Sequence, residues 1–360
     1  MDRRSFLRSS ALGGAAAATA TLAAPAYAQG NRTLTMVTSW GRGLAGVHDA
    51  AQRAADSITA MTDGALTIDL RSAGELVGAF EVFDAVVSGQ ADMYHAAAYY
   101  FVNQHPAYAF YTSVPFGMTA QELVNWYNHM GGSELHDELG QIFGLKSFLA
   151  GNTGAQAGGW FRSEISSPDD FNGLRFRMPG FGGEALGRLG ASVQNLPGAE
   201  VYQALASGAL DGTEWIGPWA DQAAGFQEIT QFYYAAGFHE PGAGLSLATN
   251  RDVFESLSPA HQKIIEIAAG ECHQWSLAQF LSNHGPALQQ LVAGGVQVRE
   301  FPDSVWDAFG QASGEVLDQY MDDDLFARTR TSYLESMAAS SGWITASEGS
   351  YRLQRDRVLG

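Results

Sequence analysis

An internal repeat constrains the fold of this chain more than any other feature. Residues 81–92, EVFDAVVSGQAD, and residues 200–211, EVYQALASGALD, share a Glu, a Val, an aromatic residue, an Ala, an aliphatic residue, a Ser-Gly pair and an Asp at matching positions. Chance composition does not produce so many matches in one register. The repeat therefore predicts that one local structure occurs twice.

Each copy of the repeat is typical of a helix that leads into a strand. Apolar residues recur at helical spacing, and each copy then reaches a glycine, Gly89 or Gly208, where a left-handed backbone costs little. A strand is expected after each glycine. A helix followed by a strand is half of an α/β unit, so we predict two similar α/β lobes with the function between them.

The second copy continues into Gly212-Thr213-Glu214-Trp215. A strand is expected to end here, which would place the Glu214 carboxylate and the Trp215 ring at the carboxyl edge of a sheet. Ligands bind at this edge in open α/β sheets. The alternative is a surface Glu beside a core Trp. The Gly, Pro and Trp residues that surround the pair favour a binding site.

The first residues have the pattern of an export signal. Arg3 and Arg4 precede a weakly apolar, Ala-rich run, and Ala26-Tyr27-Ala28 is a cleavage motif. Together they predict a twin-arginine signal peptide over residues 1–28 and a periplasmic mature chain that starts near Gln29. In the mature chain, Gly, Pro or charged residues interrupt every apolar run short of the roughly 20 residues that span a bilayer.

Charge and cysteine content exclude several classes of protein. The formal net charge is −18, which disfavours nucleic acid as a partner. An acidic protein also repels anions, so an anion site here requires a local Arg or a metal ion. Cys272 is the single cysteine, which excludes an internal disulfide and any cysteine-based zinc, iron–sulfur or c-type haem site. Its helical surroundings favour a structural thiol.

The remaining periodicity predicts alternating strands and helices. The first lobe is expected to read strand, helix, strand, helix, strand over residues 33–38, 48–61, 66–70, 80–88 and 91–97. The aromatic residues of 99–116 are expected to be mostly core, with some able to wall a pocket. Further expected elements are one or two helices in 122–143, strands at 145–149, 174–179, 245–249 and 296–299, a capped helix over 252–280 with a break at Ser258-Pro259, and helix over 304–339.

Motifs of common enzymes are missing from the sequence. It contains no HExxH, GxSxG, P-loop or CxxC motif, and its nine His lack metal-ligand spacing. Residues 180–185, GFGGEA, imitate a dinucleotide fingerprint, but the preceding strand carries Arg175 and Arg177 and ends in Pro179. A central parallel strand in such a fold is nearly all apolar, so we reject this interpretation. The helix start could still favour an anion.

Several motifs together resemble the solute-binding subunits of TRAP transporters, the tripartite ATP-independent periplasmic systems. They are SGQADM, FNGLRFRMPG, LPGAEVYQALASGALDGTEW and the segment 250–259. The resemblance covers nearly all of the mature chain. It implies an α/β, two-lobed periplasmic binding protein of the type II kind, with a hinge, a long helix across both lobes and a C-terminal helical extension. The expected division is 29–150 with 240–285, 151–239 with 286–335, and an extension over 336–360.

The resemblance is greatest to members that bind 2-oxo or 2-hydroxy monocarboxylates with a cation. In that branch the second Arg of the strand before the Pro binds the acid, which corresponds to Arg177. The metal ligands correspond to Gln156, Glu214 and the main-chain carbonyl of Trp215. Substrate contacts are expected from these four residues and from Glu240 and Tyr100.

The chemistry of these side chains agrees with the implied ligand. A 2-oxo acid offers a carboxylate and a keto oxygen as a chelating pair, and protein oxygens complete a shell for Na⁺ or Ca²⁺. Arg takes the carboxylate bidentately. We expect no enzyme but a receptor for a pyruvate-like acid, with Na⁺ favoured over Ca²⁺, that delivers its ligand to the small and large membrane subunits. A homodimer through the C-terminal helices is also expected.

Three alternatives remain open on the sequence. The ligand could be lactate or another 2-hydroxy acid bound with Ca²⁺. The protein could be a periplasmic enzyme exported in folded form. It could also be an interaction module with an aromatic peptide groove in residues 99–116.

Overall fold

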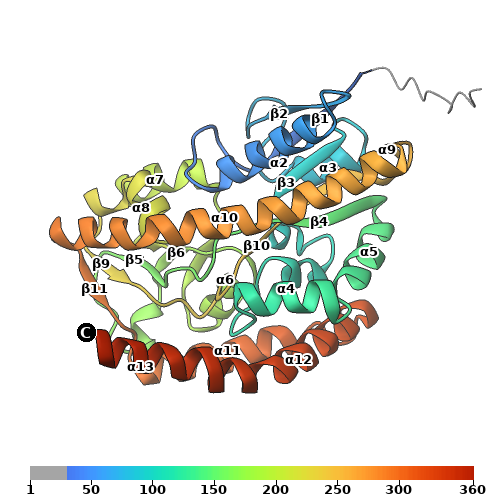
Figure 1. The fold of residues 1–360 in the computed structure, drawn as a ribbon. Coiled ribbons are helices and arrows are strands. Elements are labelled where there is room, and N and C mark those ends of the chain that lie inside the picture. Colours follow the sequence, from blue (N-terminus) through green and yellow to red (C-terminus); the bar gives the residue numbers. More distant parts are fainter. Residues whose placement is uncertain (1–30) are drawn as a thin grey trace, which may run out of the picture.

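The structure, a computed structural model, describes residues 31–360 (Figure 1). The predicted signal peptide lies outside these residues. The chain forms two α/β lobes, each built on one sheet, and a long helix passes over both. The predicted fold class is confirmed.

The first lobe contains a five-stranded sheet in the order β2-β1-β3-β10-β4. Its strands are β1 (Arg32–Thr38), β2 (Leu66–Arg71), β3 (Met93–Ala96), β4 (Leu145–Asn152) and β10 (Gly244–Asn250). The strands β1, β2 and β3 are parallel, and β10 is antiparallel to both of its neighbours. Leu34 and Met36, two residues apart on β1, face the same core as Ile58 of α2 (Val47–Met61) and Ile265 of the long helix.

The second lobe contains a six-stranded sheet in the order β11-β9-β5-β8-β6-β7. Its strands are short: β5 (Gly159–Phe161), β6 (Arg175–Arg177), β7 (Ser192–Gln194), β8 (Gly212–Thr213), β9 (Phe232–Tyr234) and β11 (Gln297–Arg299). Its helices are α6 (Gly180–Arg188), α7 (Gly198–Ala206), α8 (Pro218–Ala224) and α11 (Asp303–Asp318), with short turns η3 (Pro168–Phe171) and η4 (Phe226–Glu228).

The predicted repeat is confirmed as a repeat of topology. The first lobe runs β1-α2-β2-α3-β3, where α3 is Val82–Val87, and the second runs β6-α6-β7-α7-β8. In each lobe the first strand of the unit lies between the other two, as β2-β1-β3 and as β7-β6-β8. Gly89 and Gly208 follow the two repeated helices with φ of +76° and +75°. Both glycines therefore hold the left-handed stop that the sequence predicts.

The helix that crosses both lobes is α10 (Pro259–Ala293), preceded by α9 (Arg251–Glu255). It packs on α2 and β4 in the first lobe and on α8 in the second (Figure 1). Ser258 caps its start by accepting a hydrogen bond from the His261 N–H at 3.2 Å. The break at Ser258-Pro259 is confirmed, but the predicted end at Phe280 is wrong. Packing against α8 continues the helix past Pro286, although its sequence contains a strong helix breaker.

The C-terminal helices return to the first lobe. There α4 (Ala120–His129) and α5 (Gly132–Ile142) follow the turns η1 (Ala98–Phe101) and η2 (Pro106–Tyr111), and α12 (Asp324–Ile344) packs on η2, α4 and α5. The main-chain N–H of Met118 donates to the buried Tyr333 hydroxyl of α12 at 2.5 Å. The apolar face of α12 thus packs on elements of the first lobe, whereas the expected division assigns residues 324–335 to the second.

Beyond α12 the chain continues as a π-helical turn, η5 (Thr345–Gly349), and as α13 (Ser350–Leu359). These residues of the expected C-terminal extension are therefore helical. Within residues 31–360, no helix combines the length and the apolar composition needed to cross a membrane.

Candidate functional site

Two chain segments connect the sheets and form the base of the candidate site. Residues 153–158 lead from β4 to β5, and residues 235–243 lead from β9 back to β10. They are hydrogen-bonded to each other, since the Gln156 N–H donates to the Glu240 carbonyl at 2.9 Å and the Gly237 N–H donates to the Gln156 carbonyl at 3.2 Å. Gln156 and Glu240, distant in the sequence, therefore lie side by side between the lobes.

Strand ends of the second lobe bring Arg177 and Glu214 together. Arg177 is the last residue of β6 and is aligned with Thr213, the last residue of the parallel strand β8. Glu214 comes next in the chain. Arg177 Nη1 donates to the Glu214 carboxylate and, at 3.3 Å, to its main-chain carbonyl, and Nε donates to the Leu196 carbonyl at 3.1 Å. The strand-end prediction for these residues is confirmed in position.

The first lobe closes the opposite side of the site. Tyr99 and Tyr100 lie on η1, directly after β3, and Trp40 lies just after β1. The rings of Trp40 and Tyr100 are 6.1 Å apart between centroids, and the Trp215 ring lies 5.2 Å from the Arg177 guanidinium carbon. The cavity between the lobes is lined by Trp40, Val47, Ala97, Tyr99, Tyr100, Thr112, Thr153, Gln156, Trp215, Ile216, Glu240, Ala243 and Leu245.

Burial controls the electrostatics of this cavity. The side chains of Arg177 and Glu214 are 1% and 0% exposed, so both charges depend on each other. Burial opposes the charged form of Arg177, but the negative charge of Glu214 outweighs it and the pKa of the guanidinium is raised. Burial, and then the charge of Glu214, raise the pKa of the Glu240 carboxyl well above its usual range. Burial raises the pKa of Tyr100 to about 12.

Several buried polar atoms of the site have no hydrogen-bond partner among residues 31–360. They are the Gln156 Oε1, the Arg177 Nη2, the His239 Nδ1 and both carboxyl oxygens of Glu240. Buried polar atoms without a partner destabilise a fold, so such atoms at one place indicate a ligand. The acceptor oxygens suit a hard cation, and the guanidinium N–H suits a carboxylate.

The sequence also matches a known family of proteins. The sequence model of the bacterial extracellular solute-binding proteins, family 7, matches residues 42–324, which is most of the chain. The chain belongs to this family. Family 7 proteins are extracytoplasmic receptors rather than enzymes, so the protein is a periplasmic solute-binding protein, as the sequence predicts.

Three similar proteins have described ligands. A monocarboxylate 2-oxoacid-binding periplasmic protein from Nostoc sp. PCC 7120 is 37% identical over 329 residues, 89% of each chain. A TRAP periplasmic solute binding protein from Pseudoalteromonas atlantica T6c, with bound sodium and pyruvate, is 36% identical with a TM-score of 0.86 over 89% of this chain and 98% of that one. One from Bordetella bronchiseptica RB50, a dimer with calcium and picolinate in one site, is 31% identical with a TM-score of 0.89 over 92% and 98%.

Sequence reasoning did not single out four residues at the candidate site. Trp40, Tyr99 and Thr153 line the cavity, and the His239 Nε2 lies 3.3 Å from the Glu214 Oε2. Trp40 and Tyr99 follow the ends of parallel strands, as Glu214 does, so the strand-end rule could have identified them. His239 carries no such signal except its position beside Glu240.

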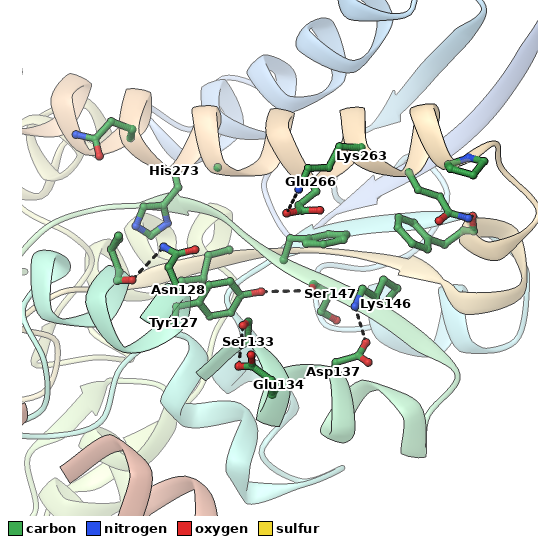
Figure 2. A pocket seen from close by; sticks show the side chains of 18 residues that line it. Tyr127, Asn128, Ser133, Glu134, Asp137, Lys146, Ser147, Lys263, Glu266 and His273 are labelled. Atoms are coloured by element: carbon green, nitrogen blue, oxygen red, sulfur yellow. Dashed lines mark hydrogen bonds and ion pairs between the residues drawn. The ribbon is translucent and has the colours of Figure 1, made fainter. Parts of the chain in front are cut away.

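A larger hollow of about 920 Å³ lies elsewhere in the first lobe (Figure 2). It lies between α10 on one side and α4 and α5 on the other, with β4 as its floor. Its two lysines are already paired: Lys146 with Asp137 at 2.7 Å, and Lys263 with Glu266 at 2.6 Å. Since these pairs leave no cationic group free to bind an acid, the cavity between the lobes is the better candidate site.

Proposed function

We propose that this TRAP solute receptor captures a small 2-oxo monocarboxylate, such as pyruvate, together with a cation, and delivers it to the membrane subunits of its transporter. The observation that carries the proposal is the set of buried, unpartnered atoms at the candidate site. A donor, the Arg177 Nη2, lies in the same site as the acceptors of Gln156 and Glu240. An acid bound with a cation supplies a partner of each kind.

Each residue has a role in this proposal. Arg177 binds the carboxylate of the acid through its guanidinium group. The Gln156 Oε1, the Glu214 carboxylate and the Trp215 main-chain carbonyl hold the cation, which neutralises charge and orients the acid through its oxygens. Glu240 and Tyr100 contact the remainder of the acid. The relatives that bind sodium with pyruvate or calcium with picolinate support a cation at this place.

We favour Na⁺ over Ca²⁺ on charge balance. Arg177 and Glu214 form a buried pair without net charge. A monocarboxylate and a monovalent cation add no net charge to this closed site. A monocarboxylate with a divalent cation adds a net positive charge, which burial makes unfavourable.

A 2-hydroxy acid such as lactate, with Ca²⁺, is the second candidate. Both Glu240 oxygens are unpartnered, and in the ionised form they would accept a hydrogen bond from a 2-hydroxyl group, which a keto acid lacks. An ionised Glu240 would also balance the second charge of Ca²⁺.

Binding requires the lobes to separate. The cavity measures about 10 Å³, roughly the space of one water molecule, which is too small for a three-carbon acid. The ligand therefore enters an open form and is enclosed when the lobes close.

Isothermal calorimetry with pyruvate, longer 2-oxo acids and lactate, each with Na⁺, with Ca²⁺ and without either cation, tests the proposal. We expect Arg177→Met to abolish acid binding, because a carboxylate buried without a partner costs several kcal/mol. The matched control is Arg175→Met. Arg175 lies on the same strand, but it is exposed and paired with Asp211, so its loss should leave acid affinity unchanged. The proposed site is wrong if Arg177→Met binds the acid as tightly as wild type does, or if the acid affinity of wild type does not depend on cations.

A variant of Glu214, the ion-pair partner of Arg177, tests binding of the cation separately from binding of the acid. Glu214→Gln should weaken the cation first and the acid through it, since each ligand supplies contacts to the other and their affinities are linked. A rise in cation concentration should therefore restore most of the acid affinity of Glu214→Gln, but none of that of Arg177→Met.

A further inference from the structure

His239 is a buried side chain to which neither the acid nor the cation gives a role. It lies on the 235–243 segment between the lobes and is 2% exposed. Its Nε2 lies 3.3 Å from the Glu214 Oε2. Because an ionised carboxylate only accepts hydrogen bonds, the ring must carry a proton on Nε2 and donate it.

This contact completes the support of the Glu214 carboxylate. Arg177 binds the Oε1 oxygen, and His239 binds the Oε2 oxygen. With a donor on each oxygen, the carboxylate cannot rotate about its terminal bond without losing a buried hydrogen bond. The direction of its remaining lone pairs is therefore set by the protein before a ligand arrives.

Two glycines form the slot that holds the His239 ring. A Cβ at Gly182 would lie 2.6 Å from the His239 Cβ, and a Cβ at Gly237 would lie 2.7 Å from its Cε1. Neither glycine has a positive φ, so what excludes a larger residue is the space taken by His239, together with Met178 beside Gly182 and Ala157 beside Gly237. This also accounts for part of the GFGGEA motif over 180–185, which does not bind a dinucleotide.

We infer that His239 is a positioning residue, which holds the Glu214 carboxylate in the orientation that binds the cation, and that Gly182 and Gly237 exist to seat it. The inference rests on the proposed function. A direct metal bond from the ring is disfavoured, because Na⁺ and Ca²⁺ take oxygen ligands.

Three variants test the inference. His239→Phe fills the slot without a donor, and His239→Gln supplies an amide N–H close to the place of Nε2. Gly182→Ala presses on the His239 Cβ and leaves the imidazole ring intact. The readouts are the dissociation constant of Na⁺ and of Ca²⁺ at saturating acid, that of pyruvate at saturating cation, and the melting temperature. We expect His239→Phe to weaken the cation 10- to 100-fold. Saturating cation should restore its acid affinity, His239→Gln should recover most of the loss, and Gly182→Ala should lie between.

His136→Phe is the matched control. His136 is also a buried histidine, stacked on Tyr111 at 3.8 Å in the first lobe, so its replacement should lower the melting temperature without changing the cation affinity.

If wild type binds acid and cation but His239→Phe changes the dissociation constant of the cation less than twofold, the inference is wrong and the proposed function stands. Equal losses in His239→Gln and His239→Phe would also overturn the donor role. Wild type without any cation dependence would instead refute the proposed function. If His239→Phe does not fold, His239→Gln and Gly182→Ala decide.

Discussion

Asp221 is a buried residue whose carboxyl group supports the candidate site from the side of Trp160. Its Oδ1 accepts hydrogen bonds from the main-chain N–H groups of Ile216 and Gly217 at 3.0 and 2.9 Å, and its Oδ2 accepts one from the Trp160 indole at 3.0 Å. These bonds fix the turn that follows Trp215. Burial outweighs them and raises the pKa of Asp221 to about 7.

The raised pKa predicts an unusual pH dependence. The folded protein holds this proton more tightly than the unfolded chain, so the contribution of Asp221 is complete below pH 4 and is lost as the pH rises through 7. The slope is at most about 1.4 kcal/mol per pH unit. Asp221→Asn lacks this slope, and its amide nitrogen cannot accept from Trp160, which should cost about 1–3 kcal/mol at pH 5. Urea unfolding from pH 5 to 8 should show the two free energies converging. Parallel profiles would contradict the shift.

At the level of elements, both repeated helices end at a glycine with a left-handed backbone conformation. Gly89 and Gly208 follow α3 and α7 in the left-handed region, and both would have open space around an added Cβ. The penalty for a larger residue there is therefore conformational and involves no clash.

Gly208→Ala isolates that conformational penalty. A left-handed alanine costs about 1–2 kcal/mol, so we expect the free energy of unfolding to fall by about 1 kcal/mol. Gly270→Ala is the control. Gly270 also has open space, but it lies inside α10 without a positive φ, so alanine there should stabilise the protein by up to about 1 kcal/mol. Denaturant titration at one pH measures both, and a shared sign for the two variants would be inconsistent with the helix-stop assignment.

At the scale of the whole molecule, the C-terminal helix α13 is not buried against the rest of the described chain. None of the residues of α13 is buried, and Trp343, Leu353 and Leu359 are 76%, 73% and 80% exposed. Figure 1 shows α13 continuing from α12 along the outside of the molecule. We propose that a second copy of the chain covers these apolar side chains in a homodimer.

Truncation after Ser341 tests the dimer. Multi-angle light scattering at micromolar concentration should give a dimeric mass for the full mature chain and a monomeric mass for the truncated one. The truncated protein should still bind acid and cation, because α13 lies outside the candidate site. A monomeric full-length chain, or a truncated chain that remains dimeric, would rule out this interface.

The local sequence determined the elements and the strand-end residues of this protein. Hydrophobic period, caps and the two glycine stops are properties of neighbouring residues, and they predict the β-α-β-α-β order of the first lobe and a second, similar α/β lobe. Parallel strands share a carboxyl edge, so the ends of both strands were expected to lie at a ligand site, and the pairing of β6 with β8 brings Arg177 and Glu214 together there.

Contacts between distant segments needed the tertiary structure. Three such contacts cannot be predicted from local sequence, because neither segment's own residues indicate the other. They are the pairing of Gln156 with Glu240, the placement of His239 against Glu214 and the packing of α12 on the first lobe. The extension of α10 past Pro286 has the same cause, because packing on α8 outweighs the local preference of proline to end a helix. Local preference is encoded residue by residue, whereas burial of one face against another depends on the whole fold.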